Sequence, residues 1–71
     1  MSLDEFLKVV DLEKQIVEVL DLYTFQFFQP KYQKMPLEWF QYMVENVYSS
    51  NDILKSESKI VVEVKPWIKL D

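Results

Sequence analysis

The chain has 71 residues, of which 49% are hydrophobic and 28% charged, which is the composition of one small folded domain and not of a disordered segment. It contains no Cys, His or Gly, so disulfides, zinc sites, imidazole chemistry and glycine-rich phosphate loops are excluded. The formal net charge is −4 and every basic residue is a lysine, so the arginine contacts that dominate nucleic-acid recognition are excluded as well.

We therefore expect a single domain over residues 1–71 that is not an enzyme, has no cofactor or metal ion, and contacts neither nucleic acid nor membrane directly. No signal-peptide pattern and no run of about 18 apolar residues is present, so a cytoplasmic protein is expected. Gly, Ala and Arg, whose codons are GC-rich, are all absent. This bias indicates a low-GC genome, as in many phages.

The first residues predict a short amphipathic helix. Ser2 stands three residues before Glu5, the spacing of a capping box, in which each side chain accepts a hydrogen bond from the backbone amide of the other residue. Apolar residues then follow at helical spacing, namely Leu3, Phe6, Leu7 and Val10.

A second helix is predicted over residues 11–28, either as a new helix capped by Asp11 or as the continuation of the first one. Its apolar residues recur at helical spacing, namely Leu12, Ile16, Leu20, Tyr23 and Phe27. Residues 23–27 also alternate like a strand, but we favour the helix because the helical period is unbroken from Leu12. Pro30 ends the element. The acids on its other faces would form an acidic face of Glu13, Glu18 and Asp21.

A third helix is predicted from Pro36 to about Tyr48, because proline fits the first position of a helix. Its apolar stripe consists of Leu37, Phe40, Val44 and Val47. Residues 49–52 would end it, with Asn51 as the capping residue. Residues 29–36 are expected to form an ordered connection before it.

Residues 59–65, KIVVEVK, form the clearest strand pattern, since Ile60, Val62 and Val64 lie at alternate positions. A hairpin within the chain, with residues 52–55 as its first strand and residues 56–58 as its turn, would supply the partner strand. A second copy of the chain is the alternative partner. The predicted fold class is α+β and mainly helical, with two or three amphipathic helices and a small C-terminal β-hairpin or strand.

Eight of the eleven aromatic residues fall within residues 23–43, which is more than three short helices and a hairpin can cover. The members on the helical stripes are assigned to the core, namely Tyr23, Phe27, Leu37, Phe40 and Val44. The residues that flank the stripes are assigned to an exposed partner-binding surface, because Tyr, Trp, Phe and Met are enriched at interface centres. This surface comprises Phe28, Tyr32, Met35, Trp39 and Tyr42. Trp67, in the C-terminal tail, is a further partner-binding residue and belongs to a second candidate contact with the strand before it.

These patterns predict a small acidic protein that binds another protein, as a phage or mobile-element inhibitor or modulator that occludes the surface of a host protein. A homodimer is also expected, because a core of this size supplies only about 3 to 5 kcal/mol of stability. Two alternatives remain open. The acidic N-terminal helix would mimic nucleic-acid phosphates, or the chain would be a structural or assembly protein that works through self-association.

Overall fold

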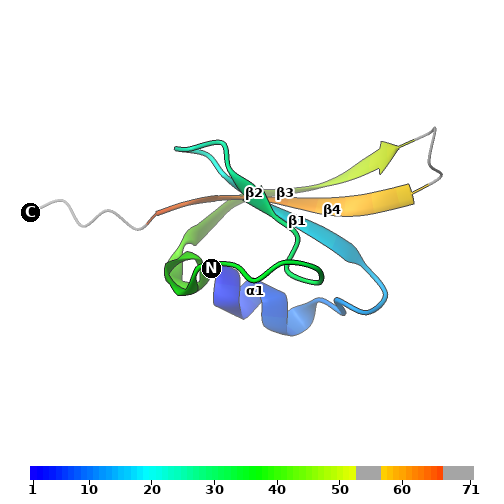
Figure 1. The fold of residues 1–71 in the computed structure, drawn as a ribbon, viewed down its shortest axis with the longest axis horizontal. Helices are drawn as coiled ribbons and strands as arrows, with labels where there is room; N and C mark the ends of the chain where they lie inside the picture. The colour runs from blue at the N-terminus through cyan, green and yellow to red at the C-terminus, as the bar shows by residue number, and fades with distance from the viewer. Residues whose placement is uncertain (53–56, 67–71) are drawn as a thin grey trace, which may run out of the picture.

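A four-stranded mixed β-sheet forms the centre of the fold, with a short helix on one of its faces (Figure 1). The computed structural model describes residues 1–52 and 57–66. The elements run in the order helix α1 (Leu3–Val9), strands β1 (Ile16–Asp21) and β2 (Phe27–Phe28), 3₁₀ helix η1 (Leu37–Gln41), and strands β3 (Met43–Asp52) and β4 (Glu57–Lys65). The prediction of a mainly helical protein is therefore wrong.

The strands lie in the order β2-β1-β4-β3 across the sheet. Strand β1 pairs antiparallel with β2 and parallel with β4, and β4 pairs antiparallel with β3. In this register, Val62 of β4 lies between Val19 of β1 and Val47 of β3. Strands β2 and β3 are thus the two edges of the sheet.

Helix α1 agrees with the prediction. Ser2 caps it, with the Ser2 Oγ accepting a hydrogen bond from the Glu5 amide at 3.3 Å. Lys8 and Asp4 form an exposed ion pair at 3.4 Å, and Leu3 is fully buried in the core. The capping spacing and the apolar stripe therefore place this helix correctly.

The second predicted helix, over residues 11–28, is wrong. Residues 11–15 form a turn, and strand β1 follows it. Ile16 and Leu20 fit a helical stripe because they are four residues apart, but a spacing of four also keeps two side chains on one face of a strand. The buried side chains of β1 are the alternating ones, namely Val17, Val19 and Asp21.

The third predicted helix, over residues 36–48, is wrong beyond its first turn. Within it only η1 is helical, and β3 follows. A β-bulge between Val44 and Asn46 explains the error, because the extra residue lets Val44 and Val47 face the same side of the sheet at a spacing of three. That spacing is typical of a helix. Asn51, the predicted helix cap, lies inside β3.

Strand β4 confirms the predicted strand over residues 59–65, and it pairs with β3 within the chain. The sequence leaves open whether this strand pairs within the chain or with a second copy, and the structure shows the hairpin. The hairpin alternative places the first strand at residues 52–55, whereas β3 supplies the whole first strand. Glu57 and Ser58, which the prediction assigns to the turn, belong to β4. Residues 53–56 lie outside the described residues.

The core lies between α1, η1 and one face of the sheet. Its buried side chains come from all of these elements and their connections, namely Leu3, Val17, Val19, Met35, Trp39, Val62 and Val64. Trp39 contacts two further rings. The centroids of Phe28 and Trp39 are 4.9 Å apart with the rings at 87°, and those of Trp39 and Tyr42 are 5.6 Å apart at 22°. One tryptophan thus joins η1 to the edge strand β2.

Candidate protein-binding site

The turn between β1 and β2 carries exposed aromatic side chains. Tyr23 is 58% exposed, Phe25 73% and Phe27, the first residue of β2, 55%. These three residues are together named the aromatic turn. Each such side chain removes roughly 150 to 250 Å² from water when it is covered. Their exposure in the free chain leaves an apolar surface beside one edge of the sheet.

Hydrogen bonds from within the turn hold its backbone. The Asp21 amide donates to the Gln26 carbonyl at 2.9 Å, and the Asp21 carbonyl accepts from the Phe25 amide at 2.8 Å. The Asp21 Oδ1 also accepts from the Tyr23 amide at 2.8 Å. At the tip, the Thr24 hydroxyl accepts from the Gln26 amide at 3.3 Å. The turn is thus fixed by its own residues, with the buried Asp21 at its base.

Phe25 has a φ of 59°, which lies in the left-handed region. A bulky residue in this region costs on the order of 1 to 3 kcal/mol, and Gly would avoid that cost. Strain of this kind is concentrated at functional sites, where the surrounding structure maintains it. The turn therefore holds an exposed aromatic side chain at some expense of stability.

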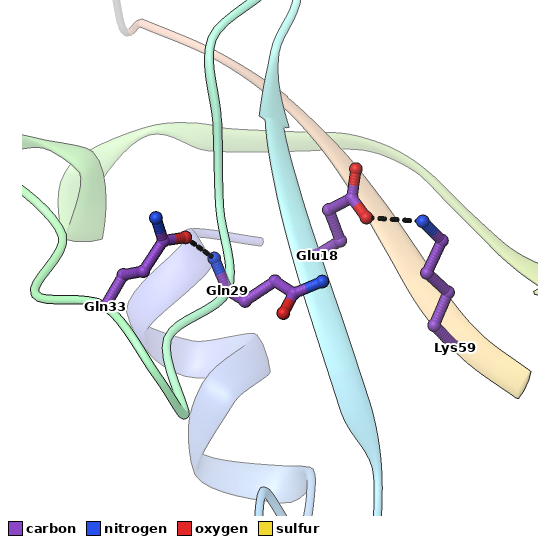
Figure 2. A network of polar contacts seen from close by, with 4 residues as sticks. All are labelled: Glu18, Gln29, Gln33 and Lys59. Carbon is purple, nitrogen blue, oxygen red and sulfur yellow. Dashed lines mark hydrogen bonds and ion pairs between the residues drawn. The ribbon is translucent and has the colours of Figure 1, made fainter. Parts of the chain in front are cut away.

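The segment after β2 is also fixed. The Gln33 Oε1 accepts a hydrogen bond from the Gln29 amide, and the Gln29 carbonyl accepts one from the Gln33 amide, both at 2.9 Å (Figure 2 shows the first). The Lys31 Nζ donates to the Glu13 carbonyl at 3.2 Å and lies 5.6 Å from the centroid of the Tyr32 ring. Tyr32 is therefore an exposed aromatic residue on a braced segment.

The sheet face away from α1 has no helix over it in the part of the chain that the structure describes (Figure 1). Glu18 of β1 and Lys59 of β4 point toward each other there, with 2.6 Å between the Glu18 Oε2 and the Lys59 Nζ (Figure 2). Leu20 shares this face with Glu18, and Phe27 lies opposite Leu20 in the register of β1 and β2. The aromatic turn therefore continues onto the open face of the sheet.

Known proteins do not assign a partner to this surface. No protein-family model matches the chain, and no curated protein or solved structure matches it significantly. Within residues 1–52 and 57–66, no helix is long and apolar enough to cross a membrane, and no group of three His, Cys, Asp or Glu residues is placed to hold a metal ion. The surface is therefore assigned from its own geometry.

The predicted partner-binding surface lies mostly in the core. Met35 is 4% exposed and Trp39 3%, so the prediction that they are exposed is wrong. Phe28 and Tyr42 are half-buried, and both pack against the Trp39 ring. The structure brings these four residues together at the core and not on an exposed surface.

The residues that the sequence assigns to the core are divided. Phe40 and Val44 are half-buried against the core, in agreement with the prediction. Tyr23, Phe27 and Leu37 are exposed, so their assignment is wrong. These assignments follow from helical stripes, and such stripes do not exist in strands. Several residues assigned to the core are therefore exposed, and several assigned to the surface are buried.

Sequence reasoning missed Phe25, which is the most exposed aromatic residue of the described chain. The signal for it is the strand-like alternation of residues 23–27, which groups Phe25 with the other two residues of the aromatic turn. Tyr32 is exposed, as predicted, and Trp67 lies outside the described residues.

The predicted acidic face of Glu13, Glu18 and Asp21 does not form, because no helix joins these residues. Glu13 is exposed in the turn before β1. Glu18 pairs with Lys59, and Asp21 is buried at the base of the aromatic turn. The structure therefore disperses the three acids.

The side chains of Tyr42 and Lys65 have raised pKa values. Burial, with smaller contributions from Glu38 and Asp21, raises the pKa of the Tyr42 hydroxyl above its usual value of 10.0. A hydrogen bond to Glu45 at 2.9 Å, together with the charge of that carboxylate, raises the pKa of the Lys65 ammonium group. Neither shift moves its group toward neutral pH.

Proposed function

We propose that this chain is a non-catalytic protein-binding module that uses the aromatic turn to occlude the surface of another protein. The observation that carries the proposal is Phe25, an exposed aromatic side chain held at positive φ by hydrogen bonds within its own turn. Aromatic side chains are enriched at the energetic centres of protein interfaces. A fixed turn also loses little conformational entropy on binding, which favours affinity.

The charges around the turn favour an apolar groove of a protein as the partner surface. Residues 22–27 carry no charge, and the neighbouring Asp21 is buried. A surface that binds a nucleic acid or an anionic membrane would instead carry lysines. The groove that we propose therefore receives the rings of Tyr23, Phe25 and Phe27.

Occlusion needs no chemistry beyond this contact, and this supports the role of an inhibitor or modulator of a host protein. The low-GC composition is compatible with a phage or mobile-element source. A mimic of nucleic-acid phosphates is less well supported, because Glu18 is paired and Asp21 is buried. Binding through the exposed aromatic side chains therefore has more physical support than mimicry of nucleic-acid phosphates.

Affinity capture with quantitative mass spectrometry tests the proposal. The wild-type chain is compared with the Phe25→Ser and Tyr23→Ser variants, and with Leu37→Ser, which removes a similarly exposed apolar side chain from η1. We expect the wild type and Leu37→Ser to capture the same host proteins in equal amounts. The two turn variants should capture at least about tenfold less of these proteins. Capture of the same proteins at the same level by all four chains would exclude the aromatic turn as the contact surface.

A further inference from the structure

The two edges of the sheet differ in how they are protected against pairing with another chain. The edge strand β2 is only two residues long, and Pro30 follows it closely. Very short strands and prolines are devices by which natural sheets block an edge. The opposite edge strand, β3, has ten residues.

Among residues 1–52 and 57–66, the N-terminal segment covers the beginning of the outer edge of β3. The Leu3 amide donates to the Tyr42 carbonyl at 2.8 Å, and the Val44 amide donates to the Met1 carbonyl at 3.0 Å. From residue 46 to residue 51, no backbone hydrogen bond to a segment other than β4 occurs among the described residues. This stretch therefore presents its outward amides and carbonyls unpaired by the described chain.

The side chains of residues 46–51 offer no protection either. Their sequence is NVYSSN, with no charge and no proline, although 28% of the chain is charged. Val47 and Tyr48 are each nearly half exposed, and successive residues of a strand point to opposite faces. A neighbouring strand would thus cover an apolar side chain on each face of the sheet.

We propose that this edge pairs antiparallel with the same edge of a second copy of the chain, which joins two four-stranded sheets into one. In a two-fold arrangement centred on Ser49, Ser49 of one copy lies opposite Ser49 of the other, and Tyr48 lies opposite the small Ser50. No charged residue meets another within residues 46–51. The nearby Glu45 forms an ion pair with Lys65 at 2.9 Å, so it places no unpaired carboxylate beside this contact.

A second copy also supplies what the fold lacks. The core has few fully buried side chains, and a chain of this length has little stability to spare. Because β2 and β3 are opposite edges, pairing through β3 leaves the aromatic turn of each copy free. The dimer would then present two aromatic turns for binding partner proteins. This consequence rests on the proposed function, whereas the pairing itself does not.

Sedimentation equilibrium of the full chain tests the pairing. The wild type and the control Gln15→Lys, an exposed position in the turn before β1, are expected to be dimers with the same dissociation constant. Ser49→Lys places two like charges across the two-fold axis and is expected to raise that constant at least about tenfold. Circular dichroism spectra of the three chains should coincide, which shows that Ser49→Lys folds.

Cross-linking provides a second readout that does not depend on the effect of a charge. Because the chain contains no Cys, Ser49→Cys introduces its only thiol, and opposite residues of an antiparallel pair lie within disulfide reach. Mild oxidation should convert Ser49→Cys, but not the control Gln15→Cys, into a covalent dimer. A monomeric wild type, an Ser49→Lys variant that remains dimeric, or equal cross-linking of both cysteine variants would overturn the proposal. Phe25→Ser should leave the dimer intact, so failure of the pairing and failure of the aromatic contact are distinguished.

Discussion

The Phe25 amide donates a hydrogen bond to the Asp21 carbonyl at 2.8 Å, and this bond closes a turn in which Phe25 has a φ of 59°. Each partner is unusual for a surface turn, since Asp21 is buried and Phe25 occupies a conformation that favours glycine. The fold thus holds a strained backbone and an exposed ring at the same residue. Stability and binding should therefore change in opposite directions when the Phe25 side chain is removed.

Phe25→Gly should raise the free energy of unfolding. Glycine adopts positive φ without strain, so a gain of about 0.5 to 1 kcal/mol is expected after its greater freedom in the unfolded chain is taken into account. Urea unfolding followed by circular dichroism measures this change. Phe25→Ala is the matched control, because it removes the ring but keeps a Cβ; an equal gain in both variants would show that backbone strain is not the cause.

Asp21→Ala should destabilise the fold by about 1 to 3 kcal/mol, because the Tyr23 amide loses its acceptor at 2.8 Å. Asp21→Asn keeps a side-chain oxygen that can accept the same bond, so it should lose less. Both variants are compared with the wild type in the same urea titration. A stability for Asp21→Ala equal to that of the wild type would contradict the bracing role of Asp21.

Trp39→Ala should lower the free energy of unfolding by about 3 to 5 kcal/mol, as for other large core side chains. This loss is comparable with the whole stability of so small a domain, so the variant should be largely unfolded by circular dichroism. Tyr32→Ala removes an exposed ring and should change stability by no more than about 0.5 kcal/mol. A folded Trp39→Ala chain of wild-type stability would place Trp39 on the surface, as the sequence predicts.

The free energy of unfolding should decrease when the pH is raised above the usual pKa values of tyrosine and lysine. The pKa values of Tyr42 and Lys65 are raised in the folded chain, so both groups hold their protons more tightly there than in the unfolded chain. Their contribution is complete below the pKa of the unfolded chain and is lost as the pH rises through the folded pKa. Urea unfolding in the alkaline range, starting from pH 10.0, the usual tyrosine pKa, measures this loss. Tyr42→Phe should show a smaller decline, and an identical decline would contradict the contribution of Tyr42.

Elements whose apolar residues recur with the period of a helix or of a strand, but not of both, could be predicted from the sequence. Helix α1 combines the Ser2 cap with an apolar stripe, and β4, a strand of nine residues, has Ile60, Val62 and Val64 at alternate positions. Both signals are local, so they do not depend on which segments pack together. The partner strand of β4 could not be predicted in the same way, because the sequence leaves open a hairpin within the chain and pairing with a second copy.

The strands β1 and β3 could not be predicted, because their apolar spacing fits a helix as well. In β3, the bulge shifts the register so that Val44 pairs with Val64 and Val47 with Val62, two buried residues on one face of β4. A three-residue spacing within a strand then imitates a helical stripe. The bulge is set by pairing with β4, which a reading of local periodicity does not include.

The error in the candidate site follows from the error in these strands. Once residues 23–28 are placed on one helix and residues 36–48 on another, Phe27 lies on an apolar stripe and is assigned to the core, whereas Trp39 flanks the other stripe and is assigned to the surface. The structure reverses both assignments, since Trp39 packs under the sheet and Phe27 lies in the exposed aromatic turn. The prediction that surplus aromatic residues remain exposed does hold for Tyr32, and the structure adds Phe25 to it.

The most direct test of the account is the affinity of the Phe25→Gly variant for a host protein captured by the wild type, measured by isothermal titration calorimetry. This variant should be at least as stable as the wild type, so a loss of binding cannot be attributed to unfolding. We expect its dissociation constant to rise about thirtyfold or more, as for the loss of an interface hot spot of about 2 kcal/mol. An unchanged dissociation constant would contradict the claim that the aromatic turn is the contact surface of this protein.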